Sequence, residues 1–122
     1  MTEYFIVDVR EEFRGKYITL WRPDNAGYCW PIPWAGRYSQ MQILENHEYY
    51  TTKRFSKNAP NFEGHAFERY PVACDIVTRL VETPERGDID GDVGPVIRNT
   101  KKNRDYLLRH RFRRPITDEV TA

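Results

Sequence analysis

Residues 21 to 39 read WRPDNAGYCWPIPWAGRYS and contain all three tryptophans of the 122-residue chain. The PDNAG run favours a turn, because proline presets φ, Asp and Asn bond their own backbone, and glycine tolerates positive φ. Residues 28 to 30 are therefore predicted to return as a strand. Pro31 and Pro33 lack the N–H group that a sheet ladder needs, so this strand is expected to be short or to lie at an edge.

The end of this stretch carries the signature of a helix N-terminus. Ser39 and Gln42 form a Ser-x-x-Gln capping box, in which each side chain bonds the backbone N–H group of the other residue. Apolar residues then recur on one side of a helix that is predicted to continue to about Glu48.

Upstream, the alternation of apolar residues predicts two more strands. Residues 3 to 9 place large apolar side chains on both sides of an extended chain, such as Phe5 and Ile6. This strand is therefore expected to be covered on both faces. Residues 16 to 21 resume the alternation after a polar turn and predict a hairpin, so that residues 28 to 30 complete a three-strand meander.

Downstream, the pattern predicts mostly loop and helix. Residues 51 to 70 show no clear period and predict a long loop, with a strand near residues 66 to 70 as the alternative. Residues 71 to 82 fill one apolar arc when they are projected on a helix, and predict an amphipathic helix.

The C-terminal part combines a short strand and a basic helix. Residues 95 to 98 predict a brief strand. Asn99 or Thr100 caps a last helix that is expected to run from Lys101 to about Phe112. The sequence thus predicts an α+β fold, with a small antiparallel sheet and two to three helices. A single domain is expected over residues 1–115, followed by a frayed tail over residues 116–122.

Composition bounds the possible functions. Hydrophobic residues make up 39% of the chain and aromatic residues 14%, while the formal net charge is only +1, so the molecule as a whole is no obvious polyanion binder. The two cysteines, Cys29 and Cys74, are expected to be free thiols in a reducing cytoplasm. No signal peptide and no membrane span is predicted.

The aromatic stretch forms the first candidate surface. Its rings Trp21, Tyr28, Trp30, Trp34 and Tyr38 lie close together among prolines. Rigid aromatic side chains provide a large contact area at low entropic cost, so one or two of them could line a groove for a peptide, a base or a protein partner. The alternative is that most of them form the core of a leucine-poor domain. Trp30 and Trp34 are the candidates for exposure.

The basic end forms the second candidate surface. From Arg98 to Arg114 there are eight Lys or Arg residues against one acid, Asp105. The residues that share one helical stripe are Lys102, Tyr106, Arg109 and Arg113. Such a stripe could follow phosphates while the tyrosine stacks on a base. The alternatives are an acidic protein partner, or a solvated helix face that the neighbouring acidic loop balances. Arg104 and Arg111 fall on the apolar side, where they could snorkel or pair with acids.

Metal binding and catalysis find little support in the sequence. The Asp88-x-Asp90-x-Asp92 run resembles the start of a calcium loop, but Val93 stands where glycine is needed and Asn99 where a bidentate glutamate belongs. We therefore predict no metal and no cofactor.

The histidines are scattered, and the chain has no nucleophile elbow, P-loop or dinucleotide fingerprint. His65, with Glu63 and Glu68 nearby, is the one candidate acid–base group. It supports only a third hypothesis, that of a small nucleotide-binding protein or hydrolase that uses the 51–70 loop. Enzyme activity is therefore not the favoured interpretation.

Two segments resemble short uncharacterised proteins of tailed phages and prophages. They are Trp-Arg-Pro-Asp-Asn-Ala-Gly-Tyr at residues 21–28 and Ala-Gly-Arg-Tyr-Ser at residues 35–39. The Asn-Thr-Lys-Lys-Asn-Arg run at residues 99–104 is similar to the closing segment of some of these proteins. The chain departs from them at residues 29–33, where a more polar, acidic segment is usual.

That family carries no established activity, so no site residue is transferred from it. The resemblance implies a phage accessory protein in the cytoplasm of the bacterial host. Such a protein would be non-enzymatic and would bind a host macromolecule, for instance to block a host or defence complex. Nucleic acid is the other partner class that the sequence suggests, and no oligomeric state is predicted.

Overall fold

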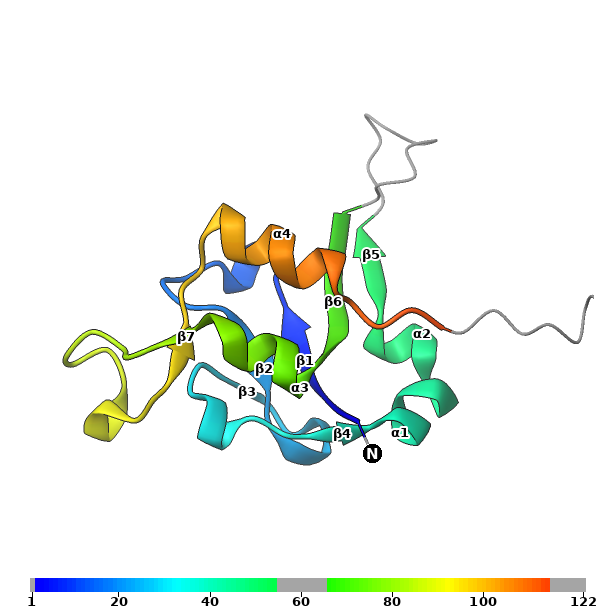
Figure 1. Cartoon of the computed structure of the whole chain (residues 1–122), viewed down its shortest axis with the longest axis horizontal. Helices are drawn as coiled ribbons and strands as arrows, with labels where there is room; N and C mark the ends of the chain where they lie inside the picture. Colours follow the sequence, from blue (N-terminus) through cyan, green and yellow to red (C-terminus); the bar gives the residue numbers. More distant parts are fainter. Residues whose placement is uncertain (1, 55–65, 115–122) are drawn as a thin grey trace, which may run out of the picture.

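The computed structural model describes residues 2–54 and 66–114 and confirms the predicted α+β fold (Figure 1). The predicted tail, residues 116–122, lies outside the described residues. In chain order the elements are β1 (Glu3–Asp8), β2 (Thr19–Trp21), β3 (Tyr28–Cys29), β4 (Tyr38–Ser39), α1 (Gln40–Glu45), α2 (His47–Tyr50), β5 (Thr52–Arg54), β6 (Ala66–Ala73), α3 (Cys74–Val77), β7 (Val81–Glu82), β8 (Val96–Ile97) and α4 (Lys101–Arg109).

The main sheet is antiparallel, with strand order β3-β2-β1-β6-β5 and with β4 pairing to β1 off this path. The predicted β1-β2-β3 meander is therefore confirmed. β3 has only two residues and lies at the edge of the sheet, in agreement with the two prolines that follow it. β6 fills the other side of β1 and pairs with β5. The long loop predicted over residues 51–70 is therefore wrong at both ends, and the alternative strand near residues 66–70 is confirmed. The rest of that range, residues 55–65, lies outside the described residues.

Both faces of the sheet are covered, as the alternation in β1 predicts. The first face, defined by Phe5 and Val7, packs under α3 and α4. The second face, defined by Tyr4 and Ile6, packs under α1 and α2. In β1, all residues from Tyr4 to Asp8 are buried. Figure 1 shows α1 and α2 at one end of the molecule and β7 with its long loop at the opposite end.

The predicted helix over residues 71–82 is wrong. β6 continues to Ala73, and five of its residues pair with β1, including Pro71 opposite Ile6. Only Cys74–Val77 form a turn of α-helix, and the chain then passes through a 3-10 turn into β7. A strand that is buried on both faces reads as a continuous apolar run, which also fills one side of a helical projection.

The two remaining helices are shorter than predicted. Ser39 caps α1, because its Oγ accepts a hydrogen bond from the Gln42 N–H group at 3.1 Å, but the helix ends at Asn46 before α2 begins. α4 ends at Arg109 instead of Phe112, because the Phe112 N–H group donates to the Pro71 carbonyl at 2.7 Å and ties the chain to β6.

The late strand forms as predicted, but it belongs to a separate two-stranded sheet. β8 pairs with β7 instead of with the main sheet. A small third cluster of Tyr17, Ile89 and Val96 fills this end of the molecule, and Ile18 donates a backbone hydrogen bond to Ile97 at 2.8 Å.

Candidate nucleic-acid interface

The outward side of α4 carries the predicted basic stripe. Thr100 starts the helix, because its Oγ1 accepts a hydrogen bond from the Asn103 N–H group at 3.1 Å. Leu107 is fully buried under the first face, whereas Lys102 and Arg109 are exposed on the side of α4 that faces solvent. A shallow hollow of about 410 Å³ on this side is lined by Lys102, Asp105, Leu108 and Arg109.

Tyr106 and Arg113 complete the stripe in different ways. Tyr106 is half-buried; its ring centroid lies 4.4 Å from that of His110 and 6.0 Å from the guanidinium carbon of Arg109. Arg113 is exposed but lies beyond the end of α4. The structure thus brings Lys102, Tyr106 and Arg109 together on one helix and places the fourth predicted residue in the segment that follows.

The positively charged side chains of this stripe are exposed to solvent. On α4 the ion pair joins Lys101 Nζ to Asp105 Oδ2 at 2.7 Å, and this hydrogen bond holds the pKa of Asp105 below its ordinary value. Lys102, Arg109 and Arg113 form no ion pair with any carboxylate in residues 2–54 and 66–114. A helix face of this kind attracts polyanions.

Two further arginines of the basic end turn inward, as predicted, but bind neutral oxygen atoms in place of acids. Arg104 donates to the Asn99 side chain. Arg111 donates to the Leu108 carbonyl at 2.9 Å and stacks 4.2 Å from the centre of the Phe67 ring. Burial lowers the pKa of Arg111 below its ordinary value. Arg111 thus attaches the segment after α4 to β6, whereas Arg104 binds the loop that precedes α4.

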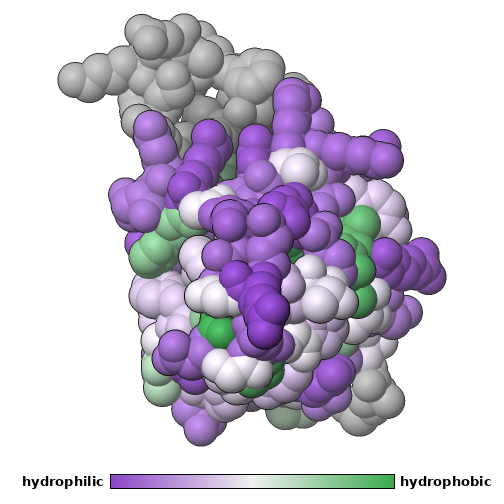
Figure 2. Space-filling model, turned by 90° about the vertical axis from the view of Figure 1, so that its left-hand side faces the viewer, coloured by the Kyte–Doolittle hydropathy of each residue, from purple (hydrophilic) through white to green (hydrophobic). Residues whose placement is uncertain are grey.

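The acidic loop, residues 82–92, forms its ion pairs with Arg98 and Lys16 instead of with α4. The Arg98 guanidinium contacts Glu82 at 2.9 Å and Glu85 at 2.8 Å, while Lys16 lies 2.9 Å from Asp88. The interpretation that this loop neutralises the basic helix is therefore wrong for the α4 side chains. Figure 2 shows this end of the molecule as mainly hydrophilic, with only small, separate hydrophobic spots.

The aromatic stretch divides between core and surface. Trp21 and Tyr38 are buried in the second-face core. Trp34 is half-buried under the guanidinium of Arg22, which stands 5.3 Å from the ring centre. Trp30 is also half-buried and packs edge-on against Tyr17, with centroids 5.3 Å apart. Neither of the two nominated tryptophans is fully exposed.

A groove does open beside one of the nominated tryptophans. It measures about 290 Å³ and is lined by Glu12, Phe13, Arg14, Gly15, Thr19, Tyr28 and Trp30. Phe13 and Tyr28 form its aromatic wall, with ring centroids 4.5 Å apart. Trp34 is not among the residues that line it. Trp30 therefore lines this groove and Trp34 does not; a binding role for either residue stays a prediction.

Two residues that the sequence did not single out, Tyr49 and Arg69, complete an aromatic surface next to this groove. Tyr28 is 44% exposed and Tyr49 is 49% exposed. Arg69 of β6 stacks on Tyr49 and on Trp21, at 5.2 and 4.8 Å from the ring centres. These residues come from distant parts of the chain, and only the pairing of β6 with β1 brings them together.

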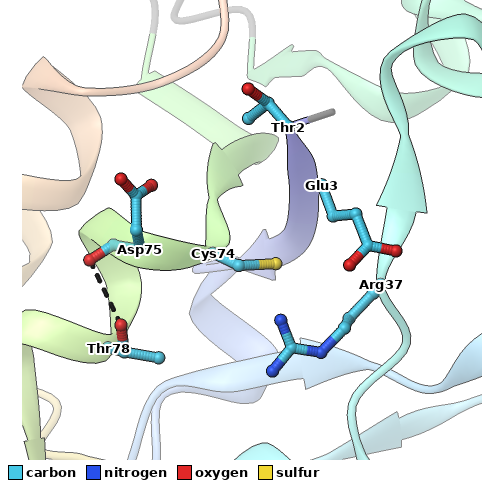
Figure 3. A pocket seen from close by; sticks show the side chains of 6 residues that line it. All are labelled: Thr2, Glu3, Arg37, Cys74, Asp75 and Thr78. Atoms are coloured by element: carbon cyan, nitrogen blue, oxygen red, sulfur yellow. Dashed lines mark hydrogen bonds between the residues drawn. The ribbon is translucent and has the colours of Figure 1, made fainter.

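A pocket of about 460 Å³ holds a buried thiol (Figure 3). The Cys74 thiol points into it, and the guanidinium of Arg37 reaches toward the thiol from β4's side. Burial raises the pKa of Cys74 to about 11 and that of Cys29 to about 11. Thiols with such pKa values are weak nucleophiles near neutral pH. Both cysteines are free, as predicted.

The described residues form no metal site, and they do not include the whole of the proposed acid–base group. Within residues 2–54 and 66–114, no cluster of three or more His, Cys, Asp or Glu side chains could hold a metal ion. Two members of the proposed acid–base group, Glu63 and His65, lie outside the described residues.

Among the helices that the structure describes, none is long and apolar enough to cross a membrane.

Comparison with known proteins gives no relative: no protein-family model, no curated protein and no solved structure matches this chain. The function must therefore be argued from the surfaces described above.

Proposed function

We propose that the protein is a non-enzymatic nucleic-acid-binding protein, and that the outward face of α4 attracts the phosphate backbone. The observation that carries this proposal is the exposure of Lys102, Arg109 and Arg113 without an ion pair to any described carboxylate. Cations that the fold does not neutralise gain most from a polyanion, because each phosphate contact releases a bound counterion. An acidic protein is the alternative partner of the same face.

The resemblance to tailed-phage and prophage proteins supports the setting of this activity. In that setting the protein is an accessory protein in the cytoplasm of a bacterial host, and the nucleic acid is that of the host or of the phage. Binding alone suffices for such a role, since occupying a nucleic acid or a host complex blocks other proteins from it.

Fluorescence anisotropy with labelled single-stranded and duplex oligonucleotides tests the proposal over salt concentrations from about 50 to about 200 mM. The variant Lys102→Glu/Arg109→Glu reverses two charges of the stripe. The matched control is Arg79→Glu/Arg86→Glu, which reverses two exposed arginines that lie outside α4. Both double variants change the net charge by the same amount.

We expect the α4 variant to lower affinity at least about tenfold for both kinds of oligonucleotide, and to reduce the salt slope by roughly two phosphate contacts. The control variant should bind like the parent protein. The absence of salt-dependent binding at about 50 mM salt would overturn the proposal and leave the acidic protein partner. An equal loss in the control variant would also contradict it.

A further inference from the structure

The sheet register places an aromatic and cationic surface on the open part of the second face. Trp21 pairs with Tyr28 across β2 and β3, and Asp8 pairs with Arg69 across β1 and β6. Paired residues of an antiparallel sheet point to the same face. Trp21 belongs to the second-face core under α1 and α2, Asp8 is buried beside it, and Tyr28 and Arg69 continue this face toward solvent.

Asp8 lies beneath this surface and holds the side chains of Arg10 and Trp21 in place through hydrogen bonds. Its side chain is fully buried and accepts hydrogen bonds from the Arg10 Nε and Nη2 atoms, at 2.9 and 3.0 Å, and from the Trp21 Nε1 atom at 3.2 Å. Arg10 is thereby fixed with its guanidinium 4.6 Å from the centre of the Phe13 ring and 3.0 Å from the Tyr28 hydroxyl oxygen. The Arg10 backbone N–H group adds a fourth hydrogen bond at 3.3 Å. A buried carboxylate that binds four donors sets the side chains in place before any ligand arrives.

The exposed rings flank one buried indole. Tyr28 and Tyr49 both pack edge-on against Trp21, with centroids 6.2 and 5.6 Å from the indole. Arg69 spans the gap, because its guanidinium stacks on Trp21 and Tyr49 and its Nε donates to the Tyr49 carbonyl at 3.0 Å. Its two Nη groups have no hydrogen-bond acceptor in the described part of the chain. With respect to the described residues they are therefore available to a ligand.

The two arginines of this surface differ in their ion pairs. Arg10 contacts the carboxylates of Asp8 at 2.9 Å and of Glu12 at 3.7 Å, so its charge is offset. Arg69 forms no ion pair with any described carboxylate. A guanidinium group that lies over aromatic rings, next to rings that are almost half exposed, suits a ligand that combines planar groups with phosphates.

We propose that this surface, which we call the stacking face (Arg10, Trp21, Tyr28, Tyr49 and Arg69), binds unstacked bases of a single-stranded nucleic acid. The proposal rests on the nucleic-acid-binding function proposed above and adds the strand type. Tyr28 and Tyr49 each offer a ring to a base, and Arg69 contacts the phosphate between them. Duplex bases stay paired and stacked inside the helix, so duplex nucleic acid gains only from the basic stripe on α4.

The test compares a base-bearing single strand with an abasic strand of equal length and charge. The variant Tyr28→Leu/Tyr49→Leu removes both rings but keeps apolar side chains, and Tyr28→Phe/Tyr49→Phe keeps the rings. Thermal denaturation confirms that each variant is folded. The single variant Tyr49→Leu repeats the test if the double leucine variant is unfolded, because Tyr49 is the more exposed ring.

We expect the parent protein and the phenylalanine variant to bind the base-bearing strand about tenfold to a hundredfold more tightly than the abasic strand. The leucine variant should bind both strands alike, with duplex affinity unchanged. Equal binding of the two strands by the parent protein overturns the stacking face while leaving the α4 proposal intact. An equal loss of affinity for both strands and the duplex in the leucine variant overturns it as well. Absence of all binding contradicts the proposed function itself.

Discussion

The β7–β8 end and the outward face of α4 are both rich in charge, yet they use it in opposite ways. At the β7–β8 end, Arg98 bridges Glu82 and Glu85 and stacks 5.3 Å from the ring centre of Tyr17. On α4, Lys102 and Arg109 form no ion pair with any described carboxylate. The difference teaches that the local count of basic residues does not identify a binding surface. Pairing in the folded state decides which cations remain available.

The inward side of α4 should matter for stability more than any of its charges. Replacing Leu107 by alanine removes a side chain that is fully buried in the first-face core. We expect the free energy of unfolding to fall by about 2 to 5 kcal/mol, because a cavity remains under the helix. Urea denaturation measures this. A loss well below about 1 kcal/mol would show that α4 is not anchored through this residue.

A matched pair of methionine substitutions separates the two charged regions. Arg98→Met breaks the ion pairs with Glu82 and Glu85 and leaves Glu85 with Lys16, at 3.5 Å, so we expect a lower Tm. Arg109→Met removes an exposed cation of the stripe and should leave the Tm unchanged. Oligonucleotide affinity should respond in the opposite order. The comparison breaks down if Arg109→Met destabilises the protein as much as Arg98→Met does.

Local patterns in the sequence predicted those parts of the fold that depend on neighbouring residues. The β1-β2-β3 meander followed from alternation and turn residues, and Ser39 and Thr100 cap their helices as predicted. The stripe on α4 needed only helical spacing. The helix predicted over residues 71–82 failed because β6 is defined by its long-range pairing with β1, which no local window contains.

The stacking face was beyond prediction for the same reason. Trp21 and Tyr28 were nominated as neighbours in sequence, but Tyr49 and Arg69 reach them only through the register of β6 against β1. The arginine at position 69, between Glu68 and Tyr70, suits a solvent-facing position. It does not indicate which ring lies beneath it. Cross-strand contacts of this kind depend on the whole sheet.

The smallest expected effect concerns pH and again separates the two charged regions. Hydrogen bonds from Arg98 hold the pKa of Glu85 below its ordinary value of 4.5, and those from Lys16 hold the pKa of Asp88 below 3.8. A carboxyl group with a lowered pKa in the folded state stabilises the protein above its unfolded pKa. This contribution is lost as the pH falls through the folded value. Stability from the β7–β8 end should therefore decline below about pH 4.5.

Comparing the parent protein with Arg98→Met isolates this contribution. The pKa of His47 is lowered by burial, which also reduces stability as the pH falls below 6.5, but both proteins share that loss. The difference between their Tm values should therefore be largest near neutral pH and shrink as the pH falls from about 4.5 to about 3. A difference that stays constant over this range would show that Arg98 acts through packing on Tyr17 instead of through its carboxylate partners.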